Sequence, residues 1–207
     1  MLSATLSFSL FAALLTITPG LDTMFVVRTA AISGRAAGFA AAVGIGTGCL
    51  CWAAASGLGI TALLTASEVG YDVMRWTGAA YLCYLGIRTL LRSRRAAVVE
   101  MPDLPRRTVG ASFRVGLLTN LLNPKIGVFY LAALPQFLPR GVPVLPASLL
   151  LGLVHDVEGI VWFTALILLV GRAAAWFARD NVRRWLDRLS GVVFIGFGAR
   201  LALEKAH

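Results

Sequence analysis

Residues 2–27 read LSATLSFSLFAALLTITPGLDTMFVV, an apolar run that is interrupted at Pro19-Gly20. A helix that crosses a bilayer needs about 20 apolar residues, so the run is long enough to span. Proline removes a backbone N–H and glycine weakens a helix, so we expect a spanning helix that is broken at this point. Within a bilayer the backbone groups freed by a break cannot face lipid. They must therefore line protein or a water-filled cavity.

The composition of the whole chain extends this interpretation. Of its 207 residues, 58% are hydrophobic and 14% are charged, and the mean hydropathy is +0.79. Soluble domains contain about 45–50% apolar and about 25% charged residues. These values exclude a water-soluble globule, a disordered chain and a nucleic-acid-binding domain. Six apolar stretches predict an all-α membrane protein with six transmembrane helices, the fourth broken at Asn123-Pro124: 2–27, 39–64, 73–91, 113–138, 145–170 and 189–203.

The net charge of +9 predicts how these helices are oriented. Cytoplasmic loops of membrane proteins are enriched in Lys and Arg. With six spans, 14 basic residues fall on one side, four fall on the other, and Lys125 lies within the fourth span. The basic side includes the polar stretch 92–112, which we expect to be a cytoplasmic loop of a single transmembrane domain covering 1–207. Both termini are then predicted to lie outside the cytoplasm, in a multi-pass protein of the lipid bilayer.

The third and sixth stretches resemble each other. Thr77-Gly78-Ala79-Ala80-Tyr81 is followed by Gly86-Ile87-Arg88, and Ser190-Gly191-Val192-Val193-Phe194 is followed by Gly198-Ala199-Arg200. Two halves of three spans each must insert with opposite orientation, which predicts an inverted repeat of 1–107 and 108–207, as in many secondary transporters. The alternative is coincidence among glycine-rich helices.

Charged residues within the spans mark the candidate site, because a charge at a bilayer centre costs at least about 2.5–3.5 kcal/mol. Asp22 and Lys125 follow the two predicted breaks, at equivalent positions of the two halves. They could pair with each other, or bind the two ends of a zwitterion, one each. The alternative is a buried ion pair that only fixes helix packing.

The fifth span carries a second polar cluster, His155, Asp156 and Glu158. Asp156 and Glu158 are two positions apart, so on a helix they point about 200° away from each other. We expect these three residues and Asp22 to be candidates for proton coupling. The alternative is a hydrated cluster near the membrane surface. Gln136, at the end of the fourth span, could face a translocation path, although helix termination explains Pro135-Gln136-Phe137 about as well.

No motif points to an enzyme, a cofactor or a metal site. The three cysteines lie in apolar runs, the two histidines have no ligand spacing around them, and no G-x-S-x-G or phosphate-binding loop occurs. Gly44, Gly46 and Gly48 in the second span indicate close helix packing and would permit a homodimer.

Three motifs in order resemble the LysE/RhtB family of amino-acid exporters: Thr18-Pro19-Gly20-Leu21-Asp22, Asn123-Pro124-Lys125 and Pro135-Gln136-Phe137. The family's first motif is T-P-G-P-D, and Leu21 replaces its second proline here. The resemblance implies an exporter of amino acids or related metabolites in the inner membrane, driven by protons. It marks six substrate-binding candidates by match to the motifs: Pro19, Gly20, Asp22, Asn123, Pro124 and Lys125.

We therefore expect a secondary exporter that works by alternating access around the two breaks. Two alternatives stay open. One is an exporter of cations or other small solutes, in which Asp22, Asp156 and Glu158 ligate a hard cation. The other is a membrane subunit that does not transport and whose polar residues contact a partner protein.

Overall fold

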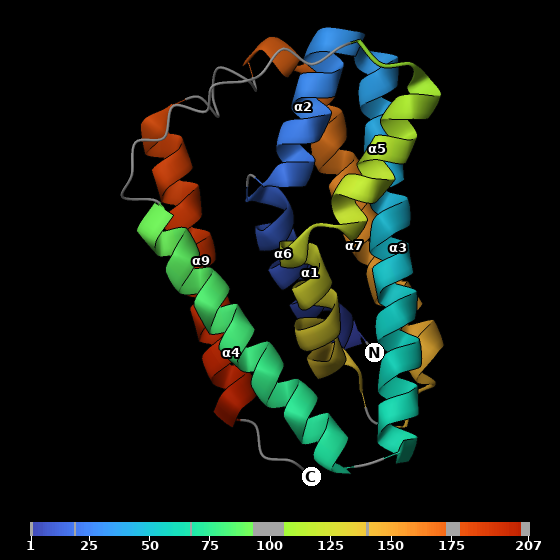
Figure 1. Cartoon of the computed structure of the whole chain (residues 1–207), viewed down its shortest axis with the longest axis vertical. Helices are drawn as coiled ribbons and strands as arrows, with labels where there is room; N and C mark the ends of the chain where they lie inside the picture. The colour runs from blue at the N-terminus through green and yellow to red at the C-terminus, as the bar shows by residue number, and fades with distance from the viewer. Residues whose placement is uncertain are drawn as a thin grey trace.

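The computed structural model describes residues 2–18, 20–66, 68–92, 106–139, 141–172 and 179–203. These residues form helices joined by short connections, and no strand occurs among them, which confirms the all-α prediction. Their order is α1 (Leu2–Ile17), α2 (Leu21–Ser33), α3 (Arg35–Ala66), α4 (Glu68–Arg92), α5 (Val109–Leu121), α6 (Pro124–Val128), η1 (Phe129–Ala133), η2 (Leu134–Phe137), α7 (Val144–Leu168) and α9 (Asp180–Leu203). In Figure 1, α4 and α9 form an antiparallel pair beside the group made by the other helices.

Both predicted breaks are present. The axes of α1 and α2 differ by 54°, and the axis of α5 differs by 53° from that of the segment 124–137. Pro124 occupies the first turn of α6, where its missing N–H is no loss, and Asn123 caps this helix by accepting a hydrogen bond from Lys125 N at 3.1 Å. The segment then continues as a π-helical turn, η1, and a 3₁₀ turn, η2.

Fewer of the described helices are long and apolar enough to cross a membrane than the six that the sequence pattern predicts. Among the described residues, α3 and α7 are long and apolar enough to cross a membrane, and the two bent pairs raise this number to four. The helices α4 and α9 are long enough, but they are less apolar because charged residues such as Arg88 and Asp187 lie within them. The structure thus supports two to four candidate spans.

Small residues allow the helices to approach closely. A methyl group added at Gly44 of α3 would overlap the carbonyl oxygen of Phe113 in α5, and one added at Gly116 of α5 would overlap the carbonyl oxygen of Ala41. In the other pair, a methyl group added at Gly86 of α4 would lie 2.7 Å from the carbonyl oxygen of Gly191 in α9. The predicted packing role of the glycines is thereby confirmed for Gly44.

The interior contains two apolar clusters, while much of the outer surface is also apolar. Phe8 and Phe11 of α1 pack against Phe129 and Phe137, with ring centroids 5.4–6.1 Å apart. A second cluster gathers around Val26, Ala41 and Ile167. Large side chains on the outer face of α7 are exposed, including Val157 at 64% and Val161 at 66%. Exposed apolar area of this extent is typical of helices that face lipid.

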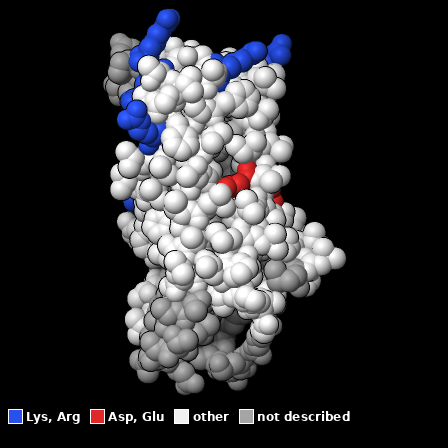
Figure 2. Space-filling model, turned by 90° about the vertical axis from the view of Figure 1, so that its right-hand side faces the viewer, with Lys and Arg blue, Asp and Glu red and all other residues white. Residues whose placement is uncertain are grey.

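Basic side chains gather at one end of the molecule. Figure 2 shows them at the upper end, whereas acidic side chains appear at a hollow midway along an otherwise uncharged face. This is the end at which α2 ends and α3 and α5 begin (Figure 1). Residues 93–105 of the predicted loop lie outside the described residues. The helix α5 already begins at Val109, within that predicted loop, because Thr108 caps it by accepting a hydrogen bond from Ala111 N.

The last helix also differs from its predicted extent. The sixth span was expected over 189–203, but α9 begins at Asp180 and is continuous to Leu203. The charged residues before position 189 therefore extend the same helix beyond its apolar part.

Candidate functional site

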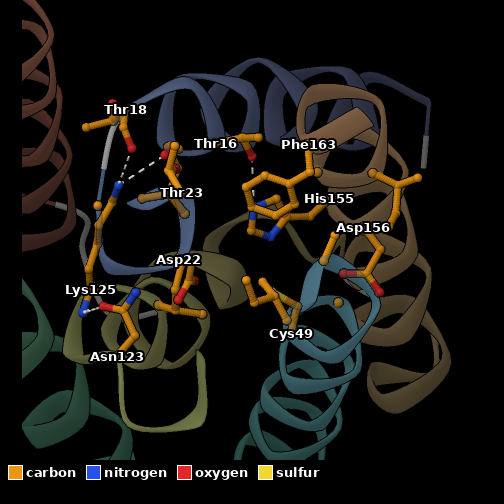
Figure 3. A pocket seen from close by; sticks show the side chains of 18 residues that line it. Thr16, Thr18, Asp22, Thr23, Cys49, Asn123, Lys125, His155, Asp156 and Phe163 are labelled. Atoms are coloured by element: carbon orange, nitrogen blue, oxygen red, sulfur yellow. Dashed lines mark hydrogen bonds between the residues drawn. The ribbon is translucent and has the colours of Figure 1, made fainter. Parts of the chain in front are cut away.

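The break in the first span exposes a specific backbone group. In a continuous helix the carbonyl of Leu15 would accept a hydrogen bond from the residue four positions later, which is Pro19. Pro19 lies outside the described residues, but proline has no N–H to donate in any conformation. The side chain of Lys125 replaces this donor: its Nζ donates to the Leu15 carbonyl at 3.0 Å and to the Thr18 carbonyl at 3.2 Å. Figure 3 shows the ammonium group reaching the end of α1.

The break in the fourth span follows the same rule. Pro124 leaves the carbonyl of Asn120 without its helical partner, and the indole Nε1 of Trp52 in α3 donates to it at 3.4 Å. Asn123 N donates to the same carbonyl at 3.0 Å. Each proline thus leaves a carbonyl to which a side chain from a distant part of the chain donates a hydrogen bond.

Asp22 lies in the first turn of α2 and is 8% exposed. Asn120 of α5 donates from Nδ2 to Asp22 Oδ2 at 2.9 Å, and the other carboxylate oxygen, Oδ1, has no hydrogen-bond partner. Asp22 and Lys125, both described, form no ion pair with each other. Their charges therefore stay separate within one buried region.

These groups surround a cavity of about 50 Å³. Its wall is formed by the two breaks together with α3 and α7 (Figure 3). The cavity is lined by these predicted site residues: Gly20, Asp22, Asn123, Lys125, His155 and Asp156. Pro124 and Gln136 do not line it, and Pro19 lies outside the described residues. Gln136 instead donates from Nε2 to the carbonyl of Ala132 at 2.9 Å, within its own helical segment.

His155 is buried and connects three elements. Tyr130 in the π-helical turn lies with its hydroxyl 2.9 Å from Nδ1, and the hydroxyl of Thr16 in α1 lies 3.1 Å from Nε2. The imidazole also packs edge-on against Phe129, with ring centroids 5.3 Å apart. Both ring nitrogens therefore have hydroxyl partners, and the side chain joins α7 to the two broken spans.

The two carboxylates of α7 occupy different surroundings, as their spacing on a helix predicts. Asp156 lines the cavity, opposite Gly46 of α3, and its Oδ1 is buried without a hydrogen-bond partner. Glu158 does not line the cavity; it accepts a hydrogen bond from Ser9 of α1. Among the described residues, no group of three or more His, Cys, Asp or Glu side chains is arranged to hold a metal ion.

Several residues of this site were not predicted. Asn120 is fully buried in α5, and the same Nδ2 that reaches Asp22 lies 3.4 Å from the Cys49 sulfur. A lone amide in an apolar span was the signal that could have identified it. Tyr130 gave no such signal, because its polar role depends on the π-helical turn. The unpredicted cavity residues include Thr16, Thr18, Thr23, Cys49 and Phe163.

Comparison with known proteins identifies the family. Residues 13–205 match the model of the LysE type translocators. The homoserine/homoserine lactone efflux protein of Salmonella typhi is 30% identical over 96% of this chain and 96% of that protein. The threonine efflux protein of Escherichia coli is 28% identical over 90% of this chain and 91% of its own length. The membrane protein YrhP of Bacillus subtilis is 28% identical over 93% of this chain and 95% of that protein. No solved structure matches the chain significantly.

The match over nearly the whole sequence, with which the broken apolar helices agree, shows that this chain is a membrane protein that belongs to the LysE family of translocators.

Proposed function

We propose that this protein is a secondary exporter that carries an amino acid, or a metabolite with similar groups, out of the cytoplasm. The observation that carries the proposal is the cavity between the two breaks, which holds an acidic and a basic side chain that do not pair with each other. Relatives named as homoserine/homoserine lactone and threonine efflux proteins support the same substrate class.

A zwitterion fits these two charges. Asp22 keeps one carboxylate oxygen without a partner, which is available to accept from an ammonium group. Lys125 has three N–H donors and uses two of them on backbone carbonyls. The third is available to donate to a substrate carboxylate. Charge-assisted hydrogen bonds of this kind are about twice as strong as neutral ones, so the pair would select substrates that carry both charges.

The small size of the cavity supports a conformation that has no room for the substrate. A volume of about 50 Å³ holds only a few water-sized molecules at about 10–15 Å³ each. This is too small for an amino acid, so binding requires the cavity to widen. The breaks at Gly20 and Asn123 are where the helix axes already bend, and we propose that alternating access turns on them.

Contacts between α4 and α9 support an inverted repeat with halves 1–107 and 108–207. The sequence alignment of these helices pairs Gly78 with Gly191 and Gly86 with Gly198. A methyl group added at Gly86 would lie 2.7 Å from the carbonyl oxygen of Gly191, and one at Gly198 would lie 2.8 Å from that of Ala79. A two-fold axis that exchanges α4 and α9 would turn the contact of Gly86 with Gly191 into one of Gly198 with Gly78. The observed contact of Gly198 is with Ala79, one residue away.

We further propose that α4 and α9 also cross the membrane, which gives six spans in the inner membrane within a single domain. The arginine-rich end would face the cytoplasm, as the positive-inside rule requires. The start of α1 and the end of α9 both lie away from that end (Figure 1), which agrees with termini outside the cytoplasm.

Proton coupling is assigned to a carboxylate on the cavity. Asp22 and Asp156 each line the cavity and each keep a carboxylate oxygen without a partner, so they are the favoured carriers. Glu158 lies off the cavity and His155 is held by two hydroxyls, and both are therefore less favoured. The cation-exporter alternative gains no support, because these carboxylates are not grouped as a metal site.

The proposal is tested with inside-out vesicles that contain the protein. Labelled threonine and homoserine are supplied outside, and a proton gradient, acidic inside, is imposed. We expect gradient-dependent uptake that falls at least about tenfold in Asp22→Asn and is kept in Cys51→Ala, whose side chain is exposed and lies outside the cavity. The site would be wrong if Asp22→Asn and Lys125→Ala both left uptake intact. The substrate class would be wrong if the folded protein carried no amino acid under any gradient.

A further inference from the structure

The carbonyls at the end of α1 form a small cluster of acceptors. Those of Leu15 and Thr18 lie at the C-terminal end of the helix, where its dipole is negative. In many transporters with broken helices, unwound carbonyls and half-helix C-terminal ends coordinate the cation that drives transport. In this protein the position is filled by an ammonium group, that of Lys125, at 3.0 Å and 3.2 Å.

The ammonium group is supplied by the other half of the protein. Lys125 follows Pro124 at the second break, and its backbone is held by the Asn123 cap. Its Nζ also passes close to the first break, because a methyl group added at Gly20 would lie 3.7 Å from it. A single side chain therefore links the two breaks on which the proposed function depends.

We propose that Lys125 is a tethered cation that closes the break of the first span, in a site that would otherwise bind a free monovalent cation. This inference rests on the proposed function, since it assigns Lys125 a task in the same carrier. The two carbonyls need positive charge when the break is closed. Because the cation is covalently attached, the carrier needs no sodium ion to reach this conformation.

The proposed role has two consequences, and the second separates it from that of a substrate ligand alone. First, transport by the parent protein should proceed at the same rate in sodium and in choline media. Second, removal of the Lys125 charge should expose a carbonyl site that sodium can occupy. A ligand that only binds a substrate carboxylate predicts neither a looser break nor rescue by a cation.

The experiment uses Cys49 as a reporter, because its buried sulfur lines the cavity. The chain has three cysteines, so Cys51→Ala with Cys83→Ala leaves Cys49 as the single thiol. The rate at which N-ethylmaleimide modifies Cys49 is measured on the purified full chain in detergent, without any substrate. We compare the modification rate of this single-thiol parent with those of its Lys125→Met and Lys125→Arg variants, in choline chloride and in sodium chloride.

We expect slow modification of the parent in both salts. In Lys125→Met the rate in choline should rise at least about tenfold, because both hydrogen bonds from the charged group to the Leu15 and Thr18 carbonyls are lost. Sodium should then slow it again, whereas Lys125→Arg should stay close to the parent. A Lys125→Met rate equal to the parent's, or a raised rate that no monovalent cation lowers, would overturn the proposal.

Two controls keep the test decisive. If Lys125→Met elutes as an aggregate, Lys125→Gln is measured in its place, because it also lacks the charge but is polar. In the parent, a strict sodium requirement for transport would also overturn the tethered-cation role. The Cys49 modification rate is measured without substrate. Failure to find a transported amino acid would therefore count against the proposed function, whereas the modification rate alone decides the tethered-cation role.

Discussion

Asn120 donates a 2.9 Å hydrogen bond from Nδ2 to Oδ2 of Asp22, and so joins the first half of one broken span to the second half of the other. The contact fixes one carboxylate oxygen and leaves Oδ1 without a partner. A buried carboxylate that is only half satisfied is costly to keep in an apolar interior. In this family of translocators the cost is consistent with a binding role for the remaining oxygen.

The first prediction concerns the charge of Asp22. In Asp22→Asn the carbonyl oxygen of the new amide can still accept from Asn120, so we expect a folded protein. The ammonium group of a substrate would lose a charged acceptor worth about 1.5–3 kcal/mol. Threonine or homoserine efflux should therefore fall at least about tenfold. Efflux is measured as labelled substrate released from loaded cells, and an unchanged rate would exclude Asp22 as the ammonium site.

The second prediction uses a matched pair of glycines in α3. A methyl group in Gly48→Ala would lie 2.5 Å from Asn120 Oδ1 and would push this amide away from Asp22, whereas nothing lies within 4 Å of a methyl group at Gly59. Overpacking of this kind costs about 1–3 kcal/mol. We expect a lower melting temperature and weaker efflux for Gly48→Ala and neither change for Gly59→Ala. Equal behaviour of the two variants would show that the Asn120 contact is not needed.

The third prediction concerns His155, which the sequence had grouped with the proton carriers. Because hydroxyls occupy both ring nitrogens, we expect it to stabilise the packing of α7 against the broken spans. His155→Phe should lower the melting temperature and keep the pH profile of any residual transport. Combined with Tyr130→Phe, it should lower the melting temperature by less than the sum of the single effects, since contacting pairs couple by about 0.5–3 kcal/mol. Strict additivity, or an altered pH profile, would contradict this role.

Sequence patterns identified the parts of the fold that depend on local chemistry. Proline without an N–H kinks or breaks a helix when it lies in the interior, so both breaks were predictable from Pro19 and Pro124. The start of α5 at Val109 was missed, because a capping threonine in a polar stretch outweighed the hydropathy pattern. Hydropathy also failed to settle α4 and α9, whose charged residues lower the average of an otherwise regular helix.

The site was predictable only where its residues are costly to bury. Asp22, Lys125 and Asp156 could be identified as intramembrane charges, and the structure places all three on one cavity. Their partners could not be identified, because hydrogen bonds from Lys125 to Leu15 and from Asn120 to Asp22 join residues about a hundred positions apart. The π-helical turn at Phe129–Ala133, which positions Tyr130, has no periodic signal in the sequence.

The last prediction tests the orientation of the chain with two introduced cysteines. Arg106 lies shortly before α5 and Val142 shortly before α7, so the two residues flank the fourth broken span in the sequence. In a background with all three native cysteines changed to alanine, Val142→Cys should react with a membrane-impermeant maleimide in intact cells. Arg106→Cys should react only after the membrane is opened, because the basic end is expected to face the cytoplasm.

The same pair decides whether the fourth span crosses the membrane or turns back within it. A bend of 53° between α5 and the segment 124–137 is compatible with either path. A crossing path places the two cysteines on opposite sides, as the inverted repeat requires, whereas a re-entrant path places both on one side. Labelling of both from the same side would therefore remove the inverted repeat. Opposite sides with the reverse order would keep the repeat and contradict the cytoplasmic position of the arginine-rich end. We expect protection of Arg106→Cys with labelling of Val142→Cys, because a crossing fourth span with the arginine-rich end inside places the two residues on opposite sides of the membrane.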